Sequence, residues 1–449
     1  MTIFTTYSVK IRNPQIVFCN TISIYRKAVD YLIGICDENW ELMESLREIE
    51  RLSYIEEIVH KTKSHPNPRY DFDCRFYKMP TYLRRSAINE SIGKVSTYKA
   101  NMKIWKKDHR GRKPRLPIAG FIFPTMYDYN MYKETGEYSA KIKVYIRNTW
   151  DWVDIELRKS DIDYIKRHCS QRIKCVPTLR KRGKEWFLDF PFKEKAELKE
   201  INIEDQTVVA VDLGINNAAT ISVMQADGTI LGRHFCHLNA EIDRLMHKLN
   251  RIKKARQNHS HKNPRLWAKV GGINHDIAVK TALFIMDVAH LYNADTIVFE
   301  KLGRQGKLVG STKQKVNVWR TREVKSIVTD KAHRLGMHVS DVCAIGTSSL
   351  AYDGSGKVER GIDRNHSICK FKNGKIYNSD LSATYNIGAR YFAREILKSL
   401  PEMERLRIVA QVPQCRKGST CTFSTFNNLN AVLVSSDFKR LSLGRRAEM

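Results

Sequence analysis

Three carboxylates stand at or just past the ends of strand-like apolar runs in the second half of this chain, and few folds tolerate that arrangement. Asp212 follows Val208–Val211, Glu300 follows Thr296–Phe299, and Asp380 lies in Asn378–Asn386. A buried strand that ends in a charge is costly unless the charge has a partner, and a divalent cation suits converging carboxylates. Two Mg²⁺ ions about 4 Å apart, clamped by such acids, hydrolyse phosphodiesters. We therefore expect Asp212, Glu300 and Asp380 to be catalytic Mg²⁺ ligands in an enzyme that cuts nucleic acid.

Each acid has an ordinary alternative when it is taken alone. Asp212 begins an Asp-x-Gly-x-x-Asn segment, in which Asn216 or Asn217 can donate a hydrogen bond. Sugar-kinase and actin-like folds start in a similar way, and an aspartate can simply open a tight turn. Many strands end in a glutamate like Glu300, and Asp380 could be only a helix cap. The three acids occur in order at intervals of 88 and 80 residues, and this combination favours one shared site.

The charge of the chain favours a polyanionic partner. It carries 77 Lys and Arg against 48 Asp and Glu, a formal net charge of +29, and phosphate neutralisation drives binding by such chains. A membrane surface is the competing polyanion, but the sequence has no run of about 18 apolar residues and no signal-peptide core near its start. We expect a soluble prokaryotic protein, cytoplasmic and nucleoid-associated, with nucleic-acid partners and no membrane partner.

The first part of the chain changes from a strand to helices. Thr6–Arg12 alternates apolar and polar residues, and the pattern from residue 20 onward is helical, so we expect a helical lobe over residues 20–114. One amphipathic helix has a basic face that includes Arg84, Arg85, Lys103 and Lys106. Nucleic-acid contact and an ordinary solvated surface are both open interpretations of that face.

Beyond the basic linker Lys106–Pro114 the hydrophobic period becomes two. Lys141, Lys143 and Arg147 line one face of a strand-like segment whose other face is apolar, and Trp186–Phe190 adds another short strand. Short strands separated by turn signals indicate a small antiparallel barrel or sheet, which we expect over residues 1–19 and 115–203. Its basic face is either an RNA or single-strand platform or a solvated outer face.

From residue 204 the pattern alternates between strand and helix. The segments Ala219–Met224 and Thr229–Phe235 flank the turn sequence Asp227-Gly228, which predicts a hairpin. Helical patterns follow over residues 242–252 and 273–292, before the strand that ends at Glu300. A three-strand start, then helices, then a parallel strand bearing an acid is the order of an RNase H-like α/β fold.

Three segments resemble the RuvC motifs of the TnpB family, which are transposon-associated RNA-guided DNA endonucleases related to compact type V CRISPR effectors. They read Val-Asp-Leu-Gly-Ile-Asn-Asn from Val211, Ile-Val-Phe-Glu-Lys-Leu from Ile297 and Asp-Leu-Ser-Ala-Thr-Tyr-Asn-Ile-Gly-Ala-Arg from Asp380. The resemblance covers about residues 1–395. It implies a mixed α/β and β multidomain fold: a wedge-type β-barrel with an inserted helical recognition lobe, then an RNase H-like (RuvC) nuclease domain at 204–400. It also implies that Asp212, Glu300 and Asp380 are the catalytic acids, with a guide RNA and double-stranded target DNA as partners.

The chain departs from that family between the second and third motifs. The family usually carries two Cys-x-x-Cys pairs there, which bind a structural zinc, whereas the equivalent insert 343–378 contains no such pair. Cys343, His366 and Cys369 lack a fourth ligand, so we expect no zinc. Gly303–Lys307 resembles a mobile basic loop beside the nuclease site, in which Arg304 and Lys307 are candidate nucleic-acid contacts. The tail 401–449 has no assignment, and disorder and an extra lobe are both open.

The function that we expect is that of an RNA-guided, Mg²⁺-dependent DNA endonuclease that cuts both strands of a guide-matched target with one RuvC site. A compact type V CRISPR effector, or a transposon–CRISPR intermediate, would use the same parts with a different guide. An RNA-guided DNA-binding repressor without cleavage and a strand-joining transposase are further alternatives. The sequence carries no signal for the oligomeric state, the guide or the target-adjacent motif.

Overall fold

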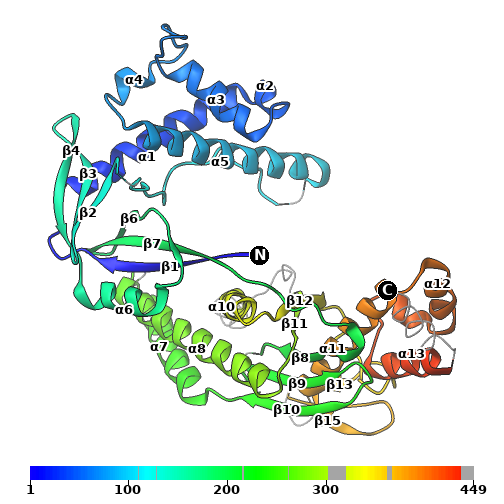
Figure 1. The fold of residues 1–449 in the computed structure, drawn as a ribbon. Coiled ribbons are helices and arrows are strands. Elements are labelled where there is room, and N and C mark those ends of the chain that lie inside the picture. The colour runs from blue at the N-terminus through cyan, green and yellow to red at the C-terminus, as the bar shows by residue number, and fades with distance from the viewer. Residues whose placement is uncertain are drawn as a thin grey trace. The chain divides into compact units, whose positions relative to one another are not determined.

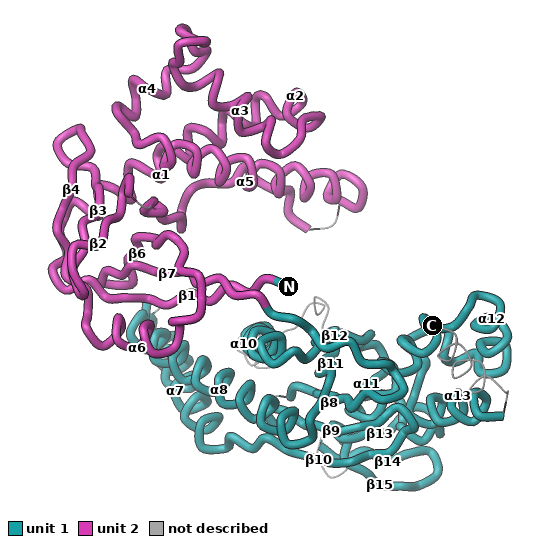
Figure 2. The backbone as a smooth tube through the Cα atoms, viewed as in Figure 1, with its two compact units in different colours: residues 1, 196–449 teal, residues 2–195 magenta. Residues whose placement is uncertain are grey.

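The computed structural model describes residues 1–109, 111–127, 129–214, 217–260, 262–301, 320–361 and 367–435. The chain divides into two compact units, which Figure 2 colours separately. One unit is Thr2–Lys195, and the other comprises Met1 with Ala196–Met449. Each unit has its own hydrophobic core.

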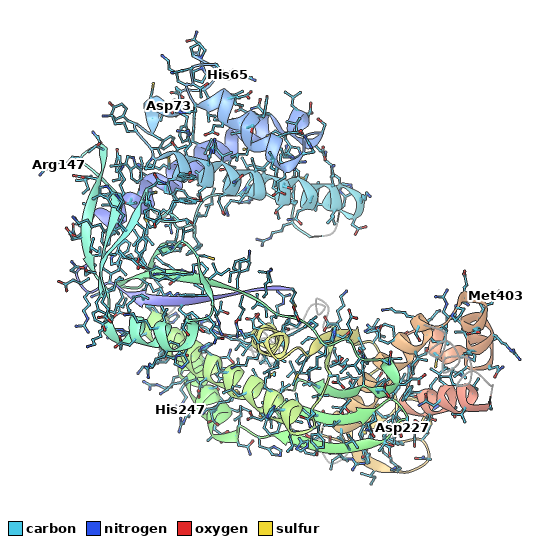
Figure 3. The ribbon with its side chains drawn as sticks, viewed as in Figure 1. His65, Asp73, Arg147, Asp227, His247 and Met403 are labelled. Atoms are coloured by element: carbon cyan, nitrogen blue, oxygen red, sulfur yellow. The ribbon has the colours of Figure 1, made fainter. Side chains whose placement is uncertain are left out.

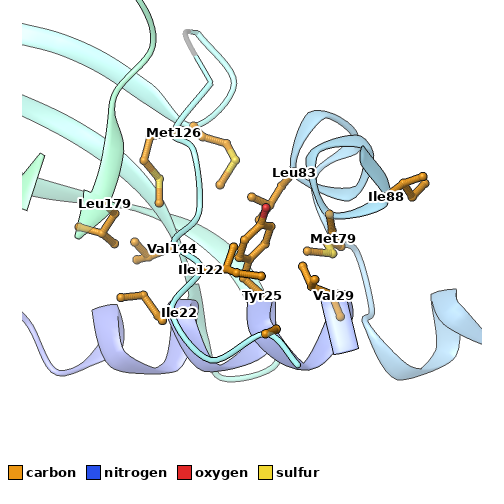
Figure 4. Close-up of a cluster of buried hydrophobic side chains, with 14 of the residues drawn as sticks. Ile22, Tyr25, Val29, Met79, Leu83, Ile88, Ile122, Met126, Val144 and Leu179 are labelled. Carbon is orange, nitrogen blue, oxygen red and sulfur yellow. The ribbon is translucent and has the colours of Figure 1, made fainter. Parts of the chain in front are cut away.

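Helices make up most of the first half of the Thr2–Lys195 unit (Figure 1). They are α1 (Val17–Glu38), α2 (Trp40–Glu44), α3 (Glu48–Val59), α4 (Phe72–Arg75) and α5 (Thr81–Asp108). The helical pattern predicted from residue 20 onward is confirmed by these elements. Tyr25 and Val29 of α1 pack with Leu83 and Ile88 of α5 in a buried cluster (Figure 4). Helix α5 ends at His109, whose left-handed backbone (φ 48°) stops the helical hydrogen bonding.

The strands of this unit form two separate sheets rather than the expected closed barrel. One sheet contains β1 (Thr2–Lys10), β7 (Glu185–Lys195), β5 (Ile173–Lys174) and β6 (Thr178–Arg182); the other contains β2 (Tyr132–Gly136), β3 (Ser139–Ile146) and β4 (Thr149–Glu156). Helix α6 (Lys159–Cys169) follows β4. Between the described strands of the two sheets, the β-bridge pairing is limited to an isolated bridge between Ile11 and Leu157. The prediction of a barrel is therefore wrong for the described residues. Strand β1 pairs with β7 along its whole length, and only one bridge connects the end of β1 to the end of β4 among these residues.

A mixed five-stranded sheet is the centre of the Ala196–Met449 unit. Its strands are β8 (Thr207–Asp212), β9 (Ala219–Gln225), β10 (Ile230–Cys236), β11 (Thr296–Lys301) and β12 (His338–Cys343), in the order β10-β9-β8-β11-β12. Strand β8 pairs antiparallel with β9 and parallel with β11, which pairs parallel with β12. The β9–β10 hairpin turns at Gly228, whose φ is +92°, so the predicted hairpin is confirmed.

Helices cover both faces of that sheet (Figure 1). Val209 and Val211 face a core shared with α8 (Pro264–Leu291) and α10 (Thr321–Arg334), while Val208 and Ala210 face α11 (Ser379–Ser399). Helix α7 (Asn239–Gln257) lies against α8 through Leu245, Leu249 and Ile252. This alternation follows from the two-residue period of a strand, and it decides which side chains meet α11.

The tail contains further helices that pack onto α11. They are α12 (Glu402–Gln411) and α13 (Phe423–Ser435), joined by a short turn, η3 (Pro413–Arg416). Ile408, Phe426 and Leu429 share the core of α11. Of the two interpretations left open for this segment, the described part, up to Ser435, follows the extra lobe; residues 436–449 lie outside the described residues.

A small three-stranded sheet lies within the segment 343–378. It consists of β13 (Glu359–Arg360), β14 (Ile368–Lys370) and β15 (Ile376–Asn378). Its core is formed by Ala351, Cys369 and Phe371, with Tyr352 and Tyr377 packed against them. Cys343 is exposed, and His366 lies outside the described residues.

A short turn, η1 (Ile203–Asp205), precedes β8. None of the helices described for this chain combines the length and the hydropathy needed to cross a membrane.

Candidate active site

Asp212 and Glu300 lie at the same end of two neighbouring parallel strands. Val211 of β8 pairs with Phe299 of β11, so the two acids follow a matched pair. Because Val208, Ala210 and Val298 face α11, the strand period places Asp212 and Glu300 on that face as well. The sequence prediction that these two acids converge therefore has a direct geometric basis.

Asp380 reaches the same face from the first turn of α11. Asn378 caps this helix by accepting a hydrogen bond from the backbone N–H of Leu381 at 2.9 Å. The Asp380 carboxylate accepts hydrogen bonds from the Asn217 amide (3.5 Å) and the Ser379 hydroxyl (3.3 Å). The positive end of a helix also favours a negative charge in its first turn. Asn216 and Ile215, from the same motif as Asn217, lie outside the described residues.

The charges of Glu300 and Asp380 both act on the Asp212 carboxyl. Burial raises the pKa of the Asp212 carboxyl well above its ordinary value, and the nearby charges of Glu300 and Asp380 raise this pKa further. Burial also raises the pKa of Glu300, while a hydrogen bond from Thr347 and the charges of Arg390 and Arg360 lower it. Three carboxyl groups that repel one another in a partly buried place form a site that favours a cation.

The donor chemistry of the three acids fits a divalent metal. Glu300 Oε1 is buried and has no hydrogen-bond partner among the described residues. Burial disfavours the charged form of Asp212. A hard cation with oxygen ligands relieves both. As the described side chains stand, no three of His, Cys, Asp and Glu are placed to hold a metal ion.

Several residues around the acids were not identified from the sequence. Arg360 of β13 donates to the carbonyl oxygen of Ser348 at 2.6 Å, and its charge lowers the pKa of both Asp212 and Glu300. The buried Asn386 of α11 donates to the carbonyls of Thr347 and Leu350, both at 2.9 Å. The available signal was that polar residues such as Asn386 and Arg390 interrupt an apolar helix, where each must find partners.

The candidate nucleic-acid contacts on α5 are largely occupied by ion pairs. Arg84 is buried and donates to Glu56 at 2.9 Å, a placement that does not fit the predicted contact with nucleic acid. Arg85 binds the same carboxylate at 2.9 Å but is half exposed. Lys103 pairs with Glu44 at the surface, and Lys106 is exposed in the last turn of α5. Glu56 lies on a different helix, so the pattern of α5 alone did not reveal this pairing.

The other candidate contacts lie on the β2-β3-β4 sheet or outside the described residues. Lys141 is 3.7 Å from Asp154 and Lys143 lies 6.0 Å from the centre of the Trp152 ring. Arg147 is exposed at the turn between β3 and β4, where Figure 3 labels it. Arg304 and Lys307 both lie outside the described residues.

Comparison with known proteins connects this chain to a named family. Residues 5–146 match the model of the Aq_aa04 family. The uncharacterized protein aq_aa04 of Aquifex aeolicus (strain VF5) is 28% identical over 110 residues, which cover 24% of this chain and 62% of that protein. Among solved structures, the cryo-EM structure of a Cas12f1–sgRNA–target DNA complex is similar with a TM-score of 0.49 and 12% identity, over 85% of this chain and 99% of that one.

The relationship to one curated protein is stronger. The TnpB-like protein aq_aa05 of Aquifex aeolicus (strain VF5) is 30% identical to this chain over 233 residues, which cover 46% of this chain and 74% of that protein. The resemblance of the three acid-bearing segments to TnpB motifs points the same way. The chain therefore belongs to the TnpB-like protein family.

Proposed function

We propose that this chain is an RNA-guided, Mg²⁺-dependent DNA endonuclease that cuts both strands of a guide-matched target at one RuvC site. The observation that carries the proposal is that Asp212 and Glu300 follow paired positions of parallel strands on the sheet face covered by α11, whose first turn carries Asp380. The strand order and the helices on both faces of the sheet support an RNase H-like (RuvC) domain. The guide RNA and the DNA target follow from the resemblance to the TnpB family, and the net charge of +29 supports polyanionic partners.

The three acids act together as metal ligands in this proposal. Asp212, Glu300 and Asp380 would hold the Mg²⁺, which when bound activates water and stabilises the leaving oxygen of a phosphodiester. Asn217 orients the Asp380 carboxylate through its 3.5 Å hydrogen bond. Glu300 Oε1, which has no hydrogen-bond partner among the described residues, is available as one of the oxygen ligands.

The direct test begins with the full chain and the RNA that co-purifies with it. Sequencing this RNA gives the guide, and a matching duplex with randomised flanking bases, labelled on both strands, is the substrate. We expect Mg²⁺-dependent cleavage of both strands that requires the RNA. Binding of the matched duplex without cleavage would replace the nuclease with the repressor, and cleavage that needs no RNA would refute guiding.

The single-site part of the proposal has its own test. One site must cut the two strands in turn, and the strand displaced by guide pairing is the more accessible, so we expect it to be cut first. Asp380→Asn should abolish both cuts, because its carboxylate serves both. If this variant still cuts one strand, a second site exists.

A further inference from the structure

Arg390 joins two segments of the chain that are distant in sequence. It lies in the middle of α11 and only 3% of its surface is exposed. Its Nη1 donates to the carbonyls of Cys343 (2.6 Å) and Ile345 (2.8 Å), its Nε to that of Cys421 (3.0 Å), and its Nη2 to that of Ser419 (3.2 Å). The planar guanidinium offers five N–H donors in a fixed arrangement, so one side chain fastens the loop 343–347 to the segment 419–421.

A second observation shows that these two segments are in close contact. Gly346 has a φ of +83°, and a Cβ at this position would lie 2.9 Å from the carbonyl oxygen of Ser419 and 3.5 Å from Nη2 of Arg390. A side chain there would both strain the backbone and push the segments apart. The close approach therefore requires glycine, independently of the hydrogen bonds that Arg390 makes.

The loop 343–347 ends at the residue beside Glu300. Thr347 is buried and its hydroxyl donates to the carbonyl oxygen of Ala344 at 2.9 Å; the same side chain lies close enough to Glu300 to lower the pKa of that carboxyl. From the other side, Asn386 donates to the Thr347 carbonyl and accepts from the backbone N–H of Phe423 at 3.0 Å. Thr347 is thus held between α11 and the chain that leads into α13.

The four carbonyls explain why an arginine stands here. An apolar side chain of similar size would fill the space, but it would take the donor from the buried Cys421 carbonyl and from three partly buried ones, and an unpaired buried acceptor costs more than its hydrogen bond contributes. Burial of the guanidinium is itself unfavourable, and it lowers the pKa of Arg390. The nearby negative charge of Glu300 partly offsets that cost.

We infer that Arg390 is a positioning residue, which holds the loop 343–347 against the segment 419–421 and so fixes Thr347 beside Glu300. The segment that follows α12 is then part of the frame of the active site rather than an appendage. This inference rests on the proposed nuclease function, since it concerns the placement of one of the three acids. Arg390 itself touches neither substrate nor metal in this account.

The experiment compares Arg390→Met with a matched control on the same helix. Arg394 is a half-buried arginine of the same helix, and it donates to the Asp341 carbonyl (2.6 Å) and the Ser340 hydroxyl (2.7 Å) of β12. For each full-length variant with its co-purified RNA, the single-turnover cleavage rate, the dissociation constant for matched DNA and the melting temperature are measured. Misplacement of a catalytic group by about 1 Å slows chemistry by about 100-fold, and we expect that loss for Arg390→Met.

The outcomes separate positioning from general stability. We expect the DNA dissociation constant of Arg390→Met to stay within about threefold of wild type, since ground-state binding is not affected. Arg390→Lys should recover part of the rate, because an ammonium group can still bond to some of the carbonyls. Gly346→Ala should lower the rate although residue 390 is still arginine. Arg394→Met should cut at nearly the wild-type rate.

Two results would overturn the inference. One is a folded Arg390→Met protein that cuts at the wild-type rate; the other is an equal loss of rate for Arg390→Met and Arg394→Met. If Arg390→Met does not fold, Arg390→Gln and Gly346→Ala decide the question by the same criteria. A wild-type protein that cuts no DNA would instead refute the proposed function, so the two failures are distinguishable.

Discussion

Asp212 and Glu300 stand one residue beyond a pair of partners in adjacent parallel strands, Val211 and Phe299. The interval of 88 residues between the acids is the same as that between every paired position of β8 and β11. Side chains at one level of neighbouring strands project to the same face, and a slip of one residue would send one of them to the opposite face. The pairing register therefore determines whether the two carboxylates form a site.

Asp212→Asn should abolish DNA cleavage and leave RNA binding unchanged. The amide keeps the size of the side chain but removes a charged ligand, and losses of about 10³-fold or more are expected when such an electrostatic contribution is removed. The control is Asp227→Asn, which changes an exposed acid in the β9–β10 turn (Figure 3). Residual cutting within tenfold of wild type would refute the assignment of Asp212.

Stability without metal should fall as the pH rises through the titration range of Asp212. Burial and the neighbouring acids raise the pKa of this carboxyl in the folded protein, so the folded chain keeps a proton that the unfolded chain has already lost. Its contribution to stability therefore decreases from the ordinary pKa of aspartate, about 3.9, up to the raised value in the folded state.

Thermal unfolding in EDTA at pH 5.5 and pH 8 measures this dependence. We expect Asp212→Asn to melt at a higher temperature than wild type at pH 8, with a smaller difference at pH 5.5. Mg²⁺ at pH 8 should stabilise the wild type more than the variant, because a ligand stabilises only the state that binds it. An unchanged difference across the two pH values would contradict the raised pKa.

Arg84 and Arg85 share one carboxylate but should differ in their effect on stability. Arg84 is buried against Glu56, so Arg84→Met removes a charge-assisted hydrogen bond from a mostly buried carboxylate that keeps only Arg85, and it should cost about 1.5–3 kcal/mol of unfolding free energy. Arg85 is half exposed, and Arg85→Met should cost less than about 1 kcal/mol. Urea unfolding of the two variants measures the difference, and equal effects would show that Arg84 is less buried in solution.

The small sheet that contains β14 should be stabilised by aromatic packing and should not need zinc. Phe371 is 2% exposed and packs against Tyr352 and Tyr377. Phe371→Ala should therefore cost about 3–5 kcal/mol, while a chelator leaves the melting temperature of the wild type unchanged. Elemental analysis of protein purified without EDTA checks the metal directly, and one zinc per chain would contradict this prediction.

Local periodicity was sufficient to predict the strands that carry the acids. Val208–Val211 and Thr296–Phe299 are continuous apolar segments, and both became strands buried on two faces. The hairpin at Asp227 and Gly228 was equally local, because the turn needs a residue that tolerates positive φ. Patterns of this kind depend only on neighbouring residues, so no knowledge of the fold was needed.

Features that depend on distant partners could not be read in the same way. Nothing near Arg84 indicates that Glu56, on another helix, would bury and neutralise it. The barrel failed for a similar reason, since closure depends on which strand occupies each edge. Asn386 and Arg390 belong to the third of the segments that resemble RuvC motifs, but their roles follow from carbonyls that come together after folding.

The pairing of β1 with β7 affects the order in which this protein can fold during its synthesis. Every residue from Thr2 to Lys10 has its partner between Phe187 and Lys195, so the first strand leaves the ribosome long before the strand that will receive it. At about 5–20 residues per second, the wait is roughly 10 to 35 s. During that interval the helices from α1 to α5 have ample time to form, while β1 presents an open edge to any other chain. A nascent-chain chaperone that covers this strand would therefore act on an element whose pairing partner has not yet been synthesised.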